Sequence, residues 1–340
     1  MAEIIEFIES LVAADAAYAS DGDVYFDVSR CRDYGKLSNR DTSELLGEGG
    51  QTADRKRNAA DFALWKSAKP GEPSWDSPWG PGRPGWHIEC SAMSYKLLGR
   101  VFDIHGGGLD LIFPHHENEI AQSECASGAP FARYWMHNGY INVDNKKMSK
   151  SLGNFFTVRD VAEKYGYEPI RYFMIAAHYR SPINYTPDLI EQSKSALSRL
   201  QNCKDTMRDY AGGAGEQGLG DLAAYKQKFI DAMDDDLNTA DALAALFELA
   251  KACNTGMANG VSGGDIAAAL ALFDELCGVL GILPEKQSAS LDAEVEALIA
   301  QRTAARAARD FAAADQIRDR LIDMGIELLD TKDGVKWRMK

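Results

Sequence analysis

One cysteine, one histidine and one glutamate near the middle of the chain have the types and spacing that a metal site requires. His115 and Glu119 are four residues apart after Phe113-Pro114, and a proline at the first position of a helix has its φ angle already set. On a helix, this spacing puts the imidazole and the carboxylate one turn apart on one face. Cys90 lies near another predicted helix start, where the helix dipole favours the thiolate. A sulfur, a nitrogen and an oxygen ligand together favour zinc over calcium or magnesium.

The same three residues have a simpler interpretation. Cys90 would then be a buried core cysteine, as free cysteines commonly are, and His115 with Glu119 a pair on a helix surface. Spacing alone does not decide between the two interpretations.

A glycine-rich segment follows the predicted strand 101–104. The glycines at 106–108 allow a ligand to approach the backbone closely, and Asp110 comes two residues later. Ligands of parallel α/β sheets lie beyond the carboxyl ends of strands, where a carboxylate can accept hydrogen bonds from ribose hydroxyls. The segment therefore indicates a nucleotide site, although a tight turn with a solvated aspartate has the same pattern.

The pentapeptide Lys-Met-Ser-Lys-Ser at 147–151 follows the predicted strand 140–143 and an Asp-Asn turn. Lys147 and Lys150 on a mobile loop could close over a triphosphate and neutralise the charge that develops as pyrophosphate leaves. Lysines on loops are more commonly solvated surface residues, so the spacing alone leaves both interpretations open.

Several motifs carry a resemblance to a known family. The segment 147–151 matches the KMSKS signature of class I aminoacyl-tRNA synthetases. The motifs that resemble the cysteinyl-tRNA synthetase family lie at 73–80, 82–93, 103–119 and 233–239, and the resemblance continues to residue 340. This resemblance implies ATP-dependent activation of cysteine, with Mg²⁺, to cysteinyl adenylate, followed by transfer to tRNA(Cys).

The resemblance also assigns roles to single residues. In the family, zinc binds the thiol of the substrate cysteine and so distinguishes it from serine, because zinc is soft toward sulfur. The matching residues are Cys90, His115 and Glu119 for zinc, Trp86 for the substrate cysteine, Gly107, Asp110 and Lys150 for ATP, and Lys147 with Lys150 for catalysis.

Two motifs of the family have no counterpart in this sequence. There is no His-x-Gly-His, and the family's first-strand zinc-ligand cysteine is missing; Cys31 falls in a segment that resembles an insertion and is not expected to replace it. We therefore expect an N-terminally truncated synthetase whose ATP turnover alone is impaired, with a separate N-terminal polypeptide as a partner. The unpaired half of a parallel sheet should expose apolar strands.

Alternation of strands and helices in 85–153 predicts a parallel α/β sheet. We expect a partial Rossmann-type nucleotide-binding domain, then an α-helical bundle and a small α+β unit. The expected domains are a partial catalytic domain at 1–155, with an insertion at 20–80 and the second half of the nucleotide-binding fold at 85–155; a stem-contact region at 156–190; a helical bundle at 191–283; and an anticodon-binding unit at 292–340.

The C-terminal segment has a different charge from the rest. The chain carries a net charge of −14, which argues against indiscriminate nucleic-acid binding, yet residues 301–340 contain nine basic and seven acidic residues. We expect tRNA contacts here. The candidates are Arg302, Arg306 and Arg309 on one helix face and Trp337 as a stacking residue; a solvated arginine face and a core tryptophan are the alternatives.

Composition places the chain among cytoplasmic proteins. Hydrophobic residues make up 45% of the 340, with no run long enough to cross a membrane, and the six cysteines are irregularly spaced. Asp234–Asp236 is interpreted as a charge cluster at a helix end. Two other functions fit the same motifs: a non-catalytic tRNA- or zinc-binding derivative, and a ligase that joins cysteine to an amino sugar.

Overall fold

The computed structural model describes residues 1–40, 54–148, 156–213, 218–284, 288–308, 310–331 and 334–339. The chain forms two compact units, Met1–Ala269 and Leu270–Lys340, and each is described by itself.

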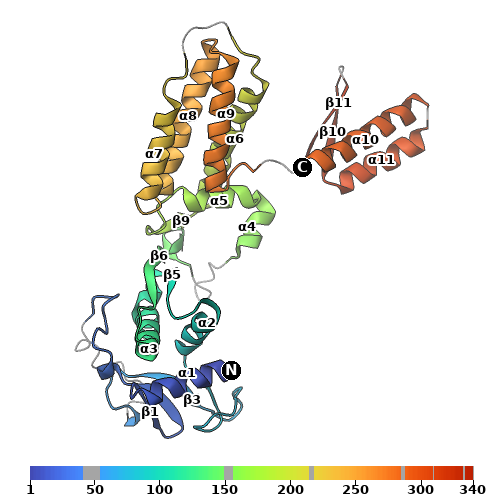
Figure 1. Cartoon of the computed structure of the whole chain (residues 1–340). Coiled ribbons are helices and arrows are strands. Elements are labelled where there is room, and N and C mark those ends of the chain that lie inside the picture. The colour runs from blue at the N-terminus through green and yellow to red at the C-terminus, as the bar shows by residue number, and fades with distance from the viewer. Residues whose placement is uncertain are drawn as a thin grey trace. The chain divides into compact units, whose positions relative to one another are not determined.

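The first unit begins with a helix and an antiparallel sheet (Figure 1). The elements are α1 (Ala2–Ala13), β1 (Ala17–Ser20), β2 (Asp23–Phe26), the short helix η1 (Val28–Arg30), β3 (Phe62–Ser67) and β4 (Gly82–Pro84). Helix α1 ends at Ala13, and the chain turns into β1 from Ala17. Asp21 and Gly22 both have positive φ angles, which suits a tight hairpin turn and pairs 17–20 with β2 instead.

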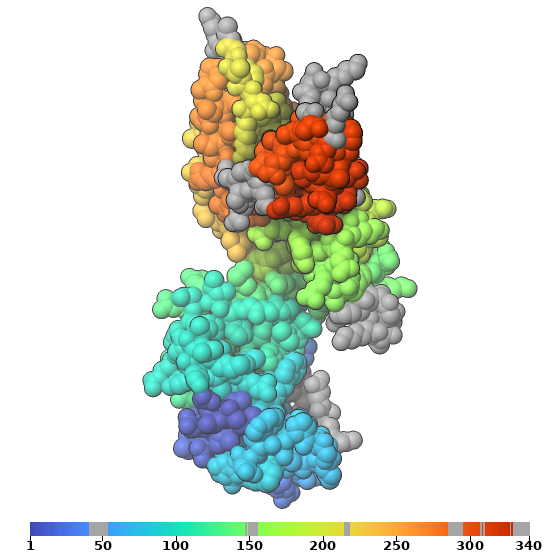
Figure 2. Space-filling view, turned by 90° about the vertical axis from the view of Figure 1, so that its right-hand side faces the viewer, coloured from blue at the N-terminus to red at the C-terminus, as the bar shows by residue number. Residues whose placement is uncertain are grey.

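The main core of this unit lies between the sheet and three helices. The helices are α1, α2 (Ile88–Leu98) and α3 (Glu117–Ser127), and α1 contributes the buried stripe Phe7, Ile8 and Leu11. Trp65 and Leu64 on β3 are fully buried against it. The space-filling view shows the blue N-terminal residues packed against the light-blue residues of the sheet (Figure 2).

Strands β5 (Phe102–Gly108) and β6 (Ala132–Asn138) form a parallel pair. The predicted strand was too short: it continues through the three glycines, which lie in β5 and not in a turn. Without side chains, Gly106 and Gly107 let Met136 and His116 approach the strand closely. The turns η4 (Leu109–Leu111) and η5 (Ile112–His116) then lead into α3.

A small mixed sheet and two helices follow. The elements are β7 (Ile141–Val143), β8 (Lys146–Lys147), α4 (Val158–Tyr165), α5 (Tyr167–Ile175) and β9 (Ile183–Tyr185), with β7 parallel to β9 and antiparallel to β8. Asp144 and Asn145 make the predicted turn, both with positive φ. Thr157 and Asp160 form a capping box at the start of α4.

Long helices make up the rest of the first unit. They are α6 (Pro187–Asp209), α7 (Leu222–Asp234) and α8 (Thr239–Ala258), which run side by side in Figure 1, while α9 (Gly263–Leu280) continues into the second unit. Thr186 and Pro187 begin α6 as the sequence predicts, because the Thr186 hydroxyl accepts a hydrogen bond from the amide of Leu189.

The second unit has its own small core. Its elements are the end of α9, α10 (Ser288–Ala307), α11 (Phe311–Asp323) and the hairpin β10 (Ile326–Thr331) and β11 (Gly334–Met339). Val295 and Ile299 of α10 pack with Leu321 and Ile326. Among the described residues of the whole chain, no helix combines the length and the apolar character needed to cross a bilayer.

Candidate metal and nucleotide site

The structure brings Cys90, His115 and Glu119 together. Cys90 lies in the first turn of α2, His115 in η5 and Glu119 in the first turn of α3. One ligand atom from each lies within 4.8 Å of the others. His115 Nε2 is 3.3 Å from Glu119 Oε1, which fits the predicted spacing of one helical turn.

Glu119 has the environment of a metal ligand. It is fully buried, and neither carboxylate oxygen receives a hydrogen bond from the described residues. His105 Nε2 lies 2.9 Å from Oε2, but without the N–H alignment of a hydrogen bond. Burial alone would raise the pKa of Glu119; the two nearby imidazoles, of His105 and His115, lower it to about 2. A buried anion without a donor fits a cation, so these residues fit zinc.

The pKa of the Cys90 thiol is not lowered, as its position at the start of a helix had predicted. Burial, together with the charge of Glu119, raises its pKa to about 11. The expected lowering by the helix dipole was wrong for the protein without metal, because desolvation and a nearby anion outweigh that dipole. A bound cation would reverse this balance, since it stabilises the thiolate directly.

Two aromatic neighbours fix the orientation of His115. His87 Nδ1 lies 2.9 Å from His115 Nδ1, and burial lowers the pKa of His87 to about 3. With Nδ1 engaged, His115 directs Nε2 toward Glu119, as metal-bound histidines generally require. Trp86 stacks on His115 with ring centroids 4.7 Å apart, and 57% of its surface is exposed. Its ring therefore borders the triad and is open to a substrate.

Sequence reasoning missed the other histidines of this region. His105 and His116 form a second group with Glu119, and His116 Nδ1 lies 2.9 Å from His137 Nε2. Burial lowers the pKa of His116 to about 4. Five of the six histidines in the sequence lie here. The adjacent pair at 115–116 was the one local signal, because His87 comes from the start of α2, and His105 and His137 from two different strands.

The expected nucleotide residues lie at the end of β5 or beyond it. A Cβ on Gly107 would lie 2.8 Å from His116 Cε1, so the bare backbone at this position is required by the histidine group. Asp110 is exposed in η4, immediately after the strand. Lys147 lies in β8, and Lys150 lies outside the described residues.

The expected tRNA residues in the second unit differ in how exposed they are to solvent. Arg302 is buried, with 8% of its surface exposed, whereas Arg306, one turn later on α10, is exposed. Arg309 lies outside the described residues, and Trp337 lies in β11. Arg302 therefore does not belong to a solvated arginine face.

Three family models match the chain in the order of its domains. Residues 1–195 match the tRNA synthetases class I (C) catalytic domain, 228–284 match the DALR domain, and 288–338 match the cysteinyl-tRNA ligase anticodon binding domain. The chain belongs to the cysteine–tRNA ligases. It is thus an aminoacyl-tRNA ligase of class I, and the expected fold class is confirmed.

Known proteins agree with this assignment to the ligases. The cysteine–tRNA ligases of Clostridioides difficile and Symbiobacterium thermophilum are each 51% identical to the chain, over 99% of its length and 74% of theirs. Among solved structures, methionyl-tRNA synthetase of Mycobacterium tuberculosis bound by methionyl-adenylate has the same fold. Its TM-score is 0.54 at 15% identity, over 82% of this chain and 70% of that one. The ligase function rests on the family models and the two relatives.

Proposed function

We propose that Cys90, His115 and Glu119 hold zinc, and that this site selects cysteine as the amino acid to be ligated. The observation that carries the proposal is the buried Glu119 carboxylate without a hydrogen-bond donor, beside a thiol and an imidazole nitrogen. Zinc bound there would supply a soft cation, which prefers the sulfur of cysteine to the hydroxyl of serine.

The residues around the triad support this selection. His87 holds His115 in one orientation, and the exposed ring of Trp86 lies against His115. A substrate side chain at the triad would therefore contact an apolar surface that keeps water away from its thiol. We assign Trp86 to the cysteine pocket on this basis.

ATP, with Mg²⁺, belongs on the β5 side of the same site. Gly107 and Asp110 stand at the carboxyl end of a parallel strand, where nucleotides bind in α/β sheets. The family motif at 147–151 supplies Lys147 and Lys150 for the phosphates. Because ATP and tRNA are the co-substrates, we place this activity in the cytoplasm.

We assign tRNA(Cys) contacts to the stem-contact region 156–190 and to the C-terminal unit 292–340, and the amino acid to the catalytic domain 1–155. Arg306 is the basic residue on α10 whose exposure supports a contact. Arg309 and Trp337 stay in the proposal on the family resemblance alone. The extent of the helical bundle, residues 191–283, is also part of this proposal.

A separate N-terminal polypeptide would cover an apolar surface on the β5–β6 pair. Ile104 and Tyr134 are paired in register, so they lie on the same face, and they are 60% and 68% exposed. The next pair, His105 and Trp135, faces the histidine group instead. Parallel sheets are normally covered on both faces, so this exposed face supports a covering segment supplied by another chain.

The zinc proposal is tested with cobalt(II), which replaces zinc and reports a thiolate ligand by an intense charge-transfer absorption. The full chain should bind about one equivalent of cobalt, and adding cysteine should increase the charge-transfer absorption, whereas serine should not. A Cys90→Ser variant should lose the absorption of the protein alone. Equal responses to cysteine and serine would contradict thiol recognition at the triad.

Ligase chemistry is tested separately by cysteine-dependent exchange of pyrophosphate into ATP, with zinc supplied and Lys150→Ala as the control. Exchange should appear, or increase, when a polypeptide carrying the family's His-x-Gly-His segment is added. Tyr134, 68% exposed on the proposed β5–β6 surface, offers a test of docking: Tyr134→Glu should reduce that increase. tRNA binding without exchange under any condition would instead favour a non-catalytic tRNA-binding derivative.

A further inference from the structure

An open cavity of about 1020 Å³ lies between the segments 28–40 and 58–60 of the first unit. Its described lining residues include three bases and one acid, which are Arg32, Lys36, Arg40 and Asp33. The whole chain has the opposite balance, with 37 basic and 51 acidic residues. None of the lining residues belongs to the two metal groups. The cavity is therefore a positively charged site in an acidic protein.

The loop 34–40, which carries part of this charge, is fixed to the start of α3. The Tyr34 hydroxyl donates a hydrogen bond of 2.5 Å to Asn118 Oδ1. The amides of Leu37 and Ser38 donate to Glu117 Oε2 at 3.2 and 2.8 Å, and the Glu117 side chain is fully buried. The loop is thus held in place by groups in the first turn of the helix that also carries Glu119.

The same loop holds the side chain of Arg40 over an aromatic ring next to the metal site. Gly35 has a φ angle of +94°, and a Cβ on it would overlap the Arg40 carbonyl oxygen, so the loop closes tightly on itself. The Arg40 guanidinium lies 4.5 Å from the centroid of the Phe113 ring. Phe113 is in η5, two residues before His115. Arg40 therefore contacts the turn that carries one of the proposed zinc ligands.

Two of the three basic side chains are available to a ligand. Lys36 pairs with Glu124, whereas Arg32 and Arg40 are exposed and have no acidic partner among the described residues. Stacking on Phe113 uses the face of the Arg40 guanidinium and leaves the N–H groups at its edge for other partners. A guanidinium binds phosphate with two parallel hydrogen bonds. These two arginines therefore fit phosphate groups.

We propose that Arg32 and Arg40 bind phosphate groups in the acceptor end of tRNA. The inference rests on the ligase function, because transfer of cysteine requires the 3′ end of the tRNA to reach the amino acid. The last phosphates of the RNA must then pass close to η5, which Arg40 contacts. A cavity of about 1020 Å³ is at the upper end of the range for small-molecule pockets, so it has room for a stretch of RNA backbone.

ATP is the other source of phosphate for this protein. The residues that we assign to it, Gly107 and Asp110, lie at the end of β5 and in η4, and neither lines the cavity. The RNA backbone is therefore the occupant that we assign to the cavity. The surface adds a tRNA contact within residues 1–155 to those assigned above to 156–190 and 292–340.

The test measures binding of two RNAs to the zinc-supplied full chain by fluorescence anisotropy: full-length tRNA(Cys), and a minihelix of its acceptor stem with the single-stranded 3′ end. Arg40→Gln should weaken minihelix binding about tenfold, as expected for hydrogen bonds to a charged group. It should also reduce the slope of log K against log salt by about 0.7–0.9, the value of one phosphate contact. Arg32→Gln should act in the same direction. Arg40→Lys should restore the slope, since the charge remains.

Arg30→Gln is the matched control. It removes the same charge from the same segment, but Arg30 pairs with Asp15 and does not line the cavity, so minihelix binding should stay within about twofold of the wild type. Binding of ATP, measured in parallel, should be unchanged in Arg40→Gln. The thermal unfolding temperature should be unchanged as well, because the side chain is exposed.

Three results would overturn the inference and leave the ligase function standing. They are full-length tRNA binding without minihelix binding by the wild type, minihelix binding that Arg40→Gln leaves unchanged, and equal losses in Arg30→Gln and Arg40→Gln. Loss of ATP binding in Arg40→Gln would assign the cavity to a free nucleotide and overturn it too. A wild-type protein that binds neither RNA would contradict the ligase function together with this inference.

Discussion

Glu119 links the stability of this protein to the zinc ion that we propose it binds. Its carboxylate is fully buried, stays ionised because the pKa is lowered to about 2, and receives no hydrogen bond from the described residues. Such a group is costly to bury unless a cation is bound beside it. The imidazoles of His105 and His115 favour the ionised carboxylate in the folded protein, and the same negative charge would raise the affinity for a metal cation.

Replacing this carboxylate should separate the two effects. Glu119→Gln should weaken cobalt or zinc binding by about 100-fold or more, because a direct ligand matters at least as much as the outer partners of a metal site. Without metal, the variant should unfold at a lower temperature than the wild type, because the folded protein favours the ionised carboxylate between His105 and His115 over a neutral group. Titration with metal and thermal unfolding measure the two effects, and the exposed Glu89→Gln on α2 serves as the matched control. Unchanged metal affinity in Glu119→Gln would remove Glu119 from the site.

Gly107 offers a second test at the level of a single residue. An alanine Cβ there would lie 2.8 and 3.0 Å from the Cε1 and Nε2 atoms of His116, which in turn contacts His137. We expect Gly107→Ala to lower the free energy of unfolding by about 1–3 kcal/mol, because the buried ring has to move. Gly106→Ala is the control, since its Cβ would lie 3.1 Å from the Met136 carbonyl oxygen and 3.8 Å from Met136 Cβ, and should cost less. Chemical denaturation compares the two variants, and equal losses would argue against the clash.

The strands β2 and β3 are held together by polar contacts of a buried side chain as well as by the hydrophobic core. Asp23 at the start of β2 is buried, and its Oδ1 accepts hydrogen bonds from the Ser67 amide and hydroxyl at the end of β3. Its Oδ2 accepts from the Tyr25 hydroxyl and from Arg55. Burial alone would raise the pKa of Asp23, but these hydrogen bonds lower it below its ordinary value of 3.8. The carboxylate thus joins two strands that are separated by a long insertion.

Because the folded-state pKa of Asp23 is lowered, its contribution to stability is complete above pH 3.8 and is lost as pH falls through the folded value. Asp23→Asn should therefore lower the free energy of unfolding by about 2 kcal/mol at neutral pH, since an amide cannot accept all four hydrogen bonds. The difference between the two proteins should shrink below pH 3.8. Denaturation at several pH values measures it, and a constant difference across the acid range would contradict the assignment.

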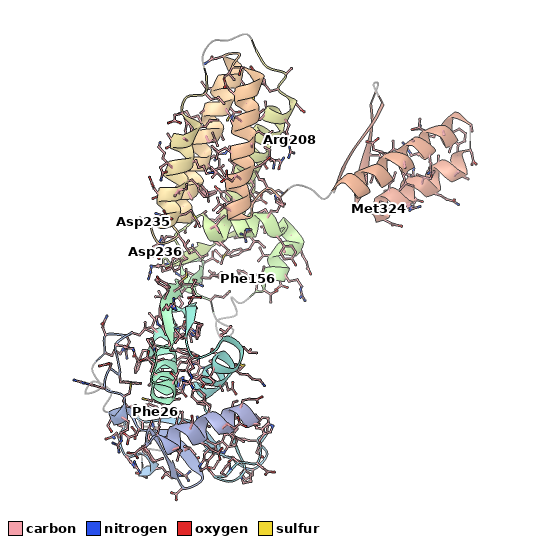
Figure 3. The ribbon with its side chains drawn as sticks, in the orientation of Figure 1. Phe26, Phe156, Arg208, Asp235, Asp236 and Met324 are labelled. Atoms are coloured by element: carbon pink, nitrogen blue, oxygen red, sulfur yellow. The ribbon has the colours of Figure 1, made fainter. Side chains whose placement is uncertain are left out.

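At the scale of the whole chain, one aspartate joins the helical region to the strands near the site. Asp236, labelled with Asp235 at the end of α7 in Figure 3, accepts hydrogen bonds from the Tyr179 hydroxyl at 2.8 Å and from Arg180 Nε at 2.5 Å. The Tyr179 carbonyl in turn accepts from the amide of Gly139, directly after β6. The acidic run lies at a helix end as predicted, and its last residue has a specific structural role.

Removing this contact should loosen the segment 177–182 without unfolding the protein. We expect Asp236→Asn to increase amide hydrogen exchange there roughly two- to fivefold, which is the size of effect that an exposed ion pair supports. Exchange followed by mass spectrometry measures this change. The exposed neighbour Asp235→Asn should leave the segment as in the wild type, and the same increase in both variants would mean that only net charge matters.

Local patterns in the sequence were sufficient for many of these features. The Thr157 cap, the proline start of α6, the turn at 144–145 and the C-terminal hairpin depend on residues close together in the chain, and the structure has all of them. The spacing of His115 and Glu119 likewise places both on one side of the helix start. The family motifs added the ligase assignment, which the family models and relatives confirm.

What only the tertiary structure decided depends on residues that are distant in sequence. Burial and a nearby anion, and not the helix start, set the pKa of Cys90. Two strands, the start of α2 and the turn η5 bring the remaining histidines together near Glu119, and hydrogen bonding to strand β6 extends β5 through its glycines. Desolvation, charge and close approach in three dimensions have no local signature in the chain, so these features follow from the fold alone.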